Sequence, residues 1–175
     1  MQISGSKIKL RLLDRSDWEL FKLLNTCPQI MEHVYEPFSI EETEERFKCR
    51  IQPWNDKSDQ WLSLTIEEID SGEKLGSIGL KITDHKAKIA EVGYLLKTEA
   101  HGKGFATEAL TLIKSYAFTT LNLNKLVGRC SSNNIGSYKV LEKVGFSREG
   151  CLKQNSIINN KYSDDYVYGL CFSAL

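Results

Sequence analysis

The sequence lacks a net charge and any long hydrophobic run. Lys+Arg and Asp+Glu both number 23 among 175 residues, so the formal charge is zero. Without an excess of positive charge, we expect no basic surface that attracts nucleic acid or a membrane. No stretch approaches the ~20 apolar residues of a membrane-spanning helix, and residues 1–7 have no apolar core of a signal peptide. The sequence therefore predicts a cytoplasmic protein without a membrane or nucleic-acid partner.

Cysteine and histidine are too few and too scattered to form a disulfide framework or a metal cluster. The five cysteines are an odd number, and no two of them form a Cys-x-x-Cys motif. Such usage is typical of reduced thiols in a cytosolic protein. The three histidines, His33, His85 and His101, lie far apart along the chain. We expect no bound metal.

What is present is ordinary for a globular protein, with 41% hydrophobic and 26% charged residues. The length is sufficient to bury a proper core. No repeat, low-complexity tract or linker divides the chain. We therefore predict a single domain over residues 1–175.

The most informative stretch runs from Glu91 to Ser115 and is predicted to be a strand, a glycine turn and a helix. Gly102 and Gly104 flank Lys103, so the backbone there can adopt positive φ and approach a ligand closely. The helix that follows would present unpaired amides and the positive end of its dipole. Such a terminus favours an anion, most often phosphate. The turn matches neither the P-loop nor the dinucleotide fingerprint, because Gly104 follows the lysine and Thr107 stands at the last glycine position.

The remaining pattern predicts the order β-α-α-β-β-β-α-β-α-β-β. The strands are expected over Lys7–Leu13, Trp61–Glu68, Lys74–Ile82, Ile89–Leu96, Lys125–Cys130, Arg148–Leu152 and Asp165–Phe172. Capping boxes at Ser16–Glu19 and Ser39–Glu42 predict two helices, which end near Cys27 and Pro53. A third helix follows the glycine turn, and a fourth, capped within Ser131–Asn134, runs through Lys143.

Two motifs resemble the GNAT N-acetyltransferase superfamily. His101–Ala106 is similar to its acyl-coenzyme A pyrophosphate loop, Gln/Arg-x-x-Gly-x-Gly/Ala, with histidine at the first position. Asn134–Phe146 resembles its Asn-x-x-Ser/Ala-x-x-x-x-Glu-Lys-x-Gly-Phe helix. Arg11–Asp14, Glu91–Tyr94 and Ala106–Ala109 resemble the RimJ/RimL branch, the ribosomal-protein N-terminal acetyltransferases. The resemblance covers nearly the whole chain. It implies a three-layer α/β/α (α+β) fold with a mixed, mostly antiparallel sheet that splays between its fourth and fifth strands.

The resemblance also implies a site for acetyl-CoA as cosubstrate, in the wedge between those two strands. The pantetheine arm would pair with the backbone near Leu95 and Leu96. The residues implied to hold the pyrophosphate are His101, Gly102, Lys103, Gly104, Phe105, Ala106 and Thr107. His101 replaces the Gln or Arg whose side chain would contact the phosphates, and Lys103 is equally an ordinary solvated lysine. Asn134 would bond the pantetheine or acyl end, serve as an ordinary N-cap, or do both.

For catalysis, Glu91 stands where some relatives carry a catalytic glutamate, although a solvated strand carboxylate is an equal alternative. Many relatives place a tyrosine seven residues beyond the helix asparagine, and here that position is Leu141. Ser137 is the expected replacement as proton donor to the thiolate, with water as the alternative. Cys130 invites a covalent acetyl-cysteine route, but a buried structural cysteine is the commoner case, so direct transfer is favoured.

The acceptor would be a primary amine bound near Met31–Phe38 and Lys153–Ser163. The branch resemblance implies the N-terminal α-amine of a ribosomal protein. Polyamine or antibiotic acetylation and a non-catalytic acyl-CoA sensor remain open alternatives. The sequence is compatible with a monomer or a homodimer.

Overall fold

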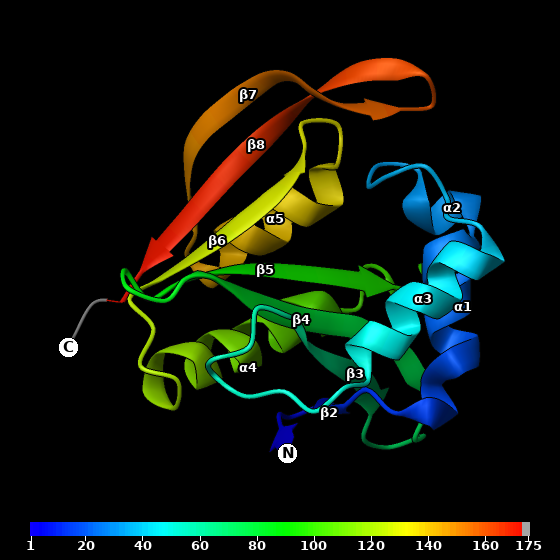
Figure 1. Ribbon diagram of the computed structural model, residues 1–175, viewed down its shortest axis with the longest axis vertical. Coiled ribbons are helices and arrows are strands. Elements are labelled where there is room, and N and C mark those ends of the chain that lie inside the picture. The colour runs from blue at the N-terminus through cyan, green and yellow to red at the C-terminus, as the bar shows by residue number, and fades with distance from the viewer. Residues whose placement is uncertain (173–175) are drawn as a thin grey trace.

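An eight-stranded sheet forms the centre of the computed structural model, in which residues 1–172 are described (Figure 1). The strand order across the sheet is β1-β2-β3-β4-β5-β6-β8-β7. Among the strands of residues 1–172, only β5 and β6 run parallel, and every other neighbouring pair is antiparallel. The strands are β1 (Gln2–Ser4), β2 (Ile8–Leu12), β3 (Leu62–Glu68), β4 (Lys74–Asp84), β5 (Ile89–Leu96), β6 (Lys125–Ser131), β7 (Ser147–Ile158) and β8 (Lys161–Cys171).

Helices cover both faces of the sheet and complete three layers. They are α1 (Trp18–Thr26), α2 (Pro28–Met31), α3 (Ile40–Arg50), α4 (Phe105–Thr119) and α5 (Ile135–Val144), with short 3-10 turns η1 (Arg15–Asp17) and η2 (Thr98–Ala100). The apolar face of α4 packs with Ile78 and Leu80 in the main core. On the other face, Phe21 of α1 and Phe47 of α3 meet Leu13 in a smaller cluster. The predicted α+β three-layer fold is confirmed.

The two central strands separate part-way along their length. Ladder pairing between β5 and β6 covers Ile89–Val92 and Lys125–Gly128 only. Beyond that point β5 stays paired with β4 up to Leu96, and β6 stays paired with β8 up to Ser131. Each half of the splay is therefore held rigidly by its outer neighbour, and the two strands visibly diverge toward α3 in Figure 1. The splay predicted between the fourth and fifth expected strands, which are β5 and β6 in the structure, is confirmed.

Two of the helix starts differ in how well the sequence predicted them. The capping box at α3 is present, because Ser39 accepts from the Glu42 amide and Glu42 accepts from the Ser39 amide. The box predicted at Ser16–Glu19 is wrong. Asp14 is the cap instead, and its reciprocal partner is Asp17. No helix of residues 1–172 is long and apolar enough to cross a membrane.

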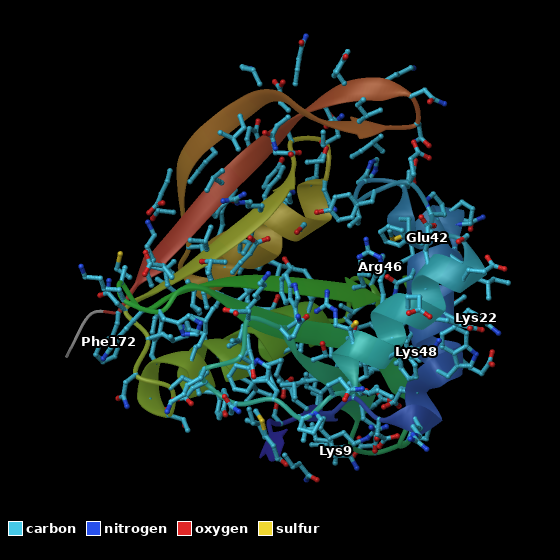
Figure 2. The ribbon with its side chains drawn as sticks, viewed as in Figure 1. Lys9, Lys22, Glu42, Arg46, Lys48 and Phe172 are labelled. Atoms are coloured by element: carbon cyan, nitrogen blue, oxygen red, sulfur yellow. The ribbon has the colours of Figure 1, made fainter. Side chains whose placement is uncertain are left out.

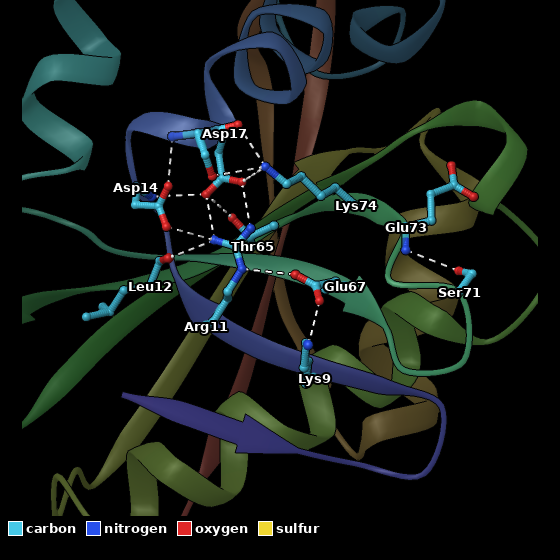
Figure 3. A network of polar contacts seen from close by, with 11 residues as sticks. Lys9, Arg11, Leu12, Asp14, Asp17, Thr65, Glu67, Ser71, Glu73 and Lys74 are labelled. Carbon is cyan, nitrogen blue, oxygen red and sulfur yellow. Dashed lines mark hydrogen bonds and ion pairs between the residues drawn. The ribbon is translucent and has the colours of Figure 1, made fainter.

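A buried polar network fixes the first helix to the sheet (Figure 3). The Asp17 carboxylate is fully buried and accepts two 2.8 Å bonds from the Arg11 guanidinium, which is a bidentate pair. Lys74 Nζ lies 2.7 Å from the same carboxylate, and the Thr65 hydroxyl donates to it at 3.0 Å. Residues of β2, β3 and β4 thus meet at the start of α1, on the sheet face that also bears the candidate site.

Candidate active site

The glycine turn has the backbone geometry of an anion site. Gly102 and Gly104 have φ of 75° and 87°, values that residues with a Cβ rarely adopt. The first helical bond of α4 runs from the Glu108 amide to the Gly104 carbonyl. The amides of residues 105–107 therefore have no acceptor within the helix and lie at the positive end of its dipole. This arrangement favours a phosphate group.

The side chains of the same turn contribute less than its backbone. His101 and Lys103 are both exposed. The His101 ring turns back toward the strand, with Nε2 3.3 Å from the Leu96 carbonyl oxygen. A contact between His101 and phosphate therefore stays a prediction, and the backbone amides remain the main anion donors.

The free edge of β5 beyond Val92 carries the backbone groups that face the splay. The Lys97 amide donates to the Leu75 carbonyl, which directs it toward β4. The backbone N–H and C=O groups of successive strand residues point to opposite neighbours. Those of Leu95 therefore also point toward β4, whereas those of Tyr94 and Leu96 point into the gap between β5 and β6. The position of His101 beside the Leu96 carbonyl agrees with this alternation. The backbone groups that could pair with a ligand in the gap therefore belong to Tyr94 and Leu96, the two neighbours of Leu95.

A cavity of about 390 Å³ passes between the separated strands. On the α1–α3 side it is lined by Trp61, Ser77, Gly79, Glu91 and Gly93, and on the α5 side by Gly128, Cys130, Ser137 and Leu141. A second molecule on the α1–α3 side can thus reach a compound held at the gap, while that compound contacts α5 on the opposite side. Zipped strands with side chains filling the gap would have excluded this arrangement.

Glu91 is half-buried in the wall of this cavity. It lies on the paired part of β5, opposite Lys81 of β4 and Val127 of β6. By strand alternation its side chain shares a face with that of Leu95, the face toward α1 and α3. A carboxylate in this place can accept a proton from an amine that enters on that side, directly or through water.

Ser137 and Asn134 lie at the start of α5, next to the gap. Asn134 Oδ1 accepts a 3.0 Å bond from the Ser137 amide, so the N-cap interpretation of Asn134 is correct. Its amide nitrogen is left for other partners. Ser137 Oγ lies 3.2 Å from the Tyr94 hydroxyl, which also donates to the Ser137 carbonyl at 3.0 Å.

Tyr94 is a site residue that the sequence did not single out. Its side chain reaches from β5 to α5, and burial raises the pKa of its hydroxyl well above the usual value despite the bond to Ser137. The group therefore stays protonated and can donate. Leu141, at the position of the missing tyrosine, is 2% exposed and packs against Gly128. The only sequence signal for Tyr94 was its position in the Glu-x-Gly-Tyr strand.

Cys130 is poorly suited to covalent catalysis. It is half-buried at the gap, and burial raises the pKa of its thiol to about 11. A nucleophilic cysteine needs a thiolate at neutral pH. The geometry therefore favours direct transfer. Within residues 1–172, no group of three or more His, Cys, Asp or Glu side chains is placed to hold a metal ion.

The outer end of the cavity brings together the two segments expected to bind the acceptor. Met31, Tyr35 and Phe38 line it from one side, and Ser156 of β7 lines it from the other. The Asn159 amide donates to Glu36, which links the β7–β8 turn to the α2–α3 loop. Sequence reasoning missed the basic wall formed by residues 46 and 50 of α3, because their spacing alone resembles a solvated helix face.

The family profile described as an acetyltransferase (GNAT) domain matches residues 7–147. The chain belongs to the GNAT acetyltransferase family. As a member of this family of enzymes it is an N-acetyltransferase, and the glycine turn, the splayed strands and α5 all lie within the matched range. The predictions of fold family and enzyme class are confirmed.

Relatives within the GNAT family have different named acceptors. Spermidine N(1)-acetyltransferase of Escherichia coli K12 is 34% identical over 91% of this chain and 83% of its own. A Bacillus subtilis protein, YdaF, named as a candidate ribosomal N-acetyltransferase, is 33% identical over 57% of this chain and 54% of its own. The crystal structure of Vibrio cholerae spermidine N-acetyltransferase with CoA and spermine superimposes with a TM-score of 0.84 at 28% identity, covering 95% of this chain and 96% of that one. These names do not select the RimJ/RimL branch.

Proposed function

We propose that this GNAT enzyme transfers an acetyl group from acetyl-CoA to a primary amine, and that the amine is the N-terminal α-amine of a peptide or protein. The observation that carries the proposal is the cavity through the splayed sheet, which joins Glu91 on one side to Ser137 on the other. The glycine turn at the end of β5 supplies amides for the diphosphate of the donor. The gap-facing backbone of Tyr94 and Leu96 suits its amide-rich pantetheine arm.

The energetics of deprotonation favour an α-amine. At pH 7 a lysine-type amine with pKa of about 10.4 requires roughly 4–5 kcal/mol to lose its proton, whereas an α-amine near 7.7–8.0 requires about 1–1.4 kcal/mol. A single half-buried carboxylate, Glu91, is sufficient for the second task. We assign Glu91 the role of general base.

We assign protonation of the leaving thiolate to the Ser137 hydroxyl, supported by its bond to Tyr94. A thiol with pKa near 8.5 leaves readily, so a weak acid is adequate. Gap-facing amides of β5 would stabilise negative charge that develops on the acyl oxygen, because they are held in place by the β4 ladder. Asn134 positions Ser137 by fixing the first turn of α5.

Spermidine is the second candidate acceptor, favoured by the names of two similar proteins. The charges in the cavity wall weigh against it. Arg46, Arg50 and Arg129 contribute three positive charges, against the carboxylates of Glu91 and Asp165. Asn155 and Ser156 already donate to Asp165, at 2.8 and 2.9 Å. A polycation would therefore meet net repulsion.

An acceptor panel with detection of released thiol tests the proposal. The panel contains N-terminal peptides, including ribosomal ones, together with spermidine and aminoglycosides. We expect acetyl-CoA-dependent thiol release with a peptide and mass addition at its α-amine. Thiol release with spermidine and with no peptide would show that the acceptor is a polyamine and not a peptide α-amine. A rise in melting temperature with acetyl-CoA, without release for any amine, would indicate a sensor.

A further inference from the structure

The guanidinium of Arg50 is half-buried in the cavity wall without an acidic partner. It lies 4.6 Å from the centre of the Trp61 ring, and its closest polar contact is a long 3.4 Å bond to the Ser63 hydroxyl. Among residues 1–172, no carboxylate forms an ion pair with it. The contrast with Arg11 is direct, because Arg11 is bonded to both Asp17 and Glu67.

Removing a cation from water is unfavourable unless a negative charge or strong acceptors replace the water. Burial, together with the like charge of Arg46, lowers the pKa of Arg50 to about 10. The group nevertheless remains charged at neutral pH. The fold therefore holds a positive charge at the cavity wall that is not neutralised from within.

Arg46 extends the same positive wall by one helical turn. Its guanidinium lies 3.8 Å from the centre of the Phe38 ring and also lines the cavity. Figure 2 shows it on the inner side of α3, between that helix and the sheet. Each guanidinium is thus stacked on an aromatic ring, a geometry that fixes its orientation and leaves donors of the planar fork available to a ligand.

The position of this pair relative to Glu91 indicates what it binds. Ring atoms of Trp61 lie 3.4 and 3.5 Å from the place of a Cβ on Gly93, which is two residues from Glu91 on the same face of β5. Trp61 therefore separates Arg50 from the strand that carries the proposed base. An extended peptide advances about 3.3–3.6 Å per residue, so its first few residues span that separation.

We propose that Arg50 and Arg46 form an anion subsite for the acceptor, which binds a carboxylate side chain within the first three residues of the peptide whose α-amine is acetylated. The inference rests on the proposed function and specifies its substrate class. Arg50 supplies the buried, oriented charge, and the exposed Arg46 adds a second donor group. Paired guanidinium and carboxylate groups give geometric selectivity as well as affinity.

The test uses three amidated tripeptides, serine followed by aspartate, asparagine or lysine and then alanine. Steady-state kinetics are measured for the wild type and for Arg50→Gln, Arg50→Lys, Arg46→Gln and Arg15→Gln. Arg15 is exposed and lies away from the cavity lining, so it is the matched control. Binding of the aspartate peptide to the CoA-bound protein is measured by calorimetry, which does not require turnover.

We expect the aspartate peptide to have the lowest KM. In Arg50→Gln its KM and Kd should rise about 30-fold or more, as when one partner of a buried charge pair is truncated. The KM for acetyl-CoA should not change. Arg50→Lys should keep part of the preference, Arg46→Gln should lose less than Arg50→Gln, and Arg15→Gln should match the wild type.

Equal KM values within this set and within matched sets that carry the varied residue first or third, or an unchanged aspartate preference in Arg50→Gln, would overturn the subsite. So would an effect on acetyl-CoA alone, because the charge would then serve the donor. If no amine is acetylated, the proposed function fails, and the calorimetric comparison still decides the subsite. If Arg50→Gln lowers the melting temperature markedly, the aspartate preference of the wild type is compared with that of Arg50→Lys and Arg46→Gln instead.

Discussion

Tyr94 and Leu141 show that a tyrosine hydroxyl can reach the start of α5 from a different element than expected. The position where many relatives carry a helix tyrosine holds a leucine that is buried against Gly128. A tyrosine hydroxyl nevertheless reaches Ser137, from β5 instead of from α5. Strand alternation places Tyr94 on the α5 face, but only the three-dimensional structure brings its hydroxyl to this serine.

Removing either hydroxyl should slow transfer without preventing folding. We expect Tyr94→Phe and Ser137→Ala each to lower kcat by about 10- to 100-fold, at or below the lower end of general acid–base effects. The double variant should lose little more than either single one, because the two groups act as a unit. The measurements are kcat and melting temperature. If the losses in the logarithm of kcat were fully additive in the double variant, the two hydroxyls would act independently.

Glu91 offers a prediction of pH dependence. The α-amine is mostly protonated below a pH of about 7.7–8.0, so a base contributes most there. Glu91→Gln should reduce kcat/KM by up to about 100-fold at pH 6.5 and much less at pH 9. Glu44→Gln, on the exposed side of α3, is the control. A loss that is the same at every pH would remove Glu91 from the role of base.

The glycine turn is a property of an element, because its geometry depends on where β5 ends and α4 begins. A Cβ on Gly104 would meet nothing within 4 Å, so only its φ of 87° requires glycine. Gly72 in the β3–β4 turn is a matched position, with φ of 71° and equally open surroundings. A residue with a Cβ should therefore meet similar backbone strain at either position.

Valine at each position should separate strain from ligand binding. We expect Gly104→Val and Gly72→Val to lower stability by a similar amount, on the order of 1–2 kcal/mol. Only Gly104→Val should weaken acetyl-CoA binding, by at least about tenfold, because it moves the amides at the start of α4. Calorimetric titration with acetyl-CoA and thermal unfolding provide the two measurements. Retained affinity in Gly104→Val would contradict the role of the turn.

Elements with a strong local pattern were predictable from the sequence. The strand Ile89–Leu96 was predicted with its observed bounds, and the helix after the glycine turn has its apolar face where expected. The β7–β8 hairpin is longer than predicted, because many residues of β7 are exposed and give no alternating signal. The first helix cap was assigned to Ser16, whereas long-range bonds from Arg11 and Lys74 hold Asp17 where it completes the Asp14 box.

The candidate site was predictable where it depends on backbone and not where it depends on packing. The turn and the N-cap at Asn134 follow from residue type and spacing, and the structure has both. The basic wall was not predictable, because Arg46 and Arg50 differ from Lys48 of the same helix in their aromatic neighbours and in the absence of an ion pair among residues 1–172. Neither feature is local in the sequence.

At the scale of the whole molecule, Asp17 connects α1 to three strands. Burial alone would raise the pKa of its carboxyl, but the bonds from Arg11, Lys74, Thr65 and the Asp14 amide outweigh burial and lower the pKa well below the usual value. A carboxyl with a lower pKa in the folded state stabilises the fold above its unfolded pKa of about 3.9. That contribution is lost as the pH falls below this value.

Asp17→Asn should lower the free energy of unfolding by about 3 kcal/mol at pH 7, because it removes the buried carboxylate shared by two half-buried cations, Arg11 and Lys74. The difference from the wild type should narrow as the pH falls below about 4. Denaturant unfolding at a series of pH values measures both. Asp70→Asn, in an exposed turn, should have no such effect. A difference that does not change with pH would assign the loss to packing.

The passage through the sheet also constrains the order of events in a catalytic cycle. In a direct transfer, which the raised pKa of the Cys130 thiol favours, acetyl-CoA and the amine must occupy the cavity at the same time. Reciprocal plots of initial velocity against either substrate should therefore intersect instead of running parallel. That result would indicate a sequential scheme, in which the bound thioester stays intact until the amine is also bound.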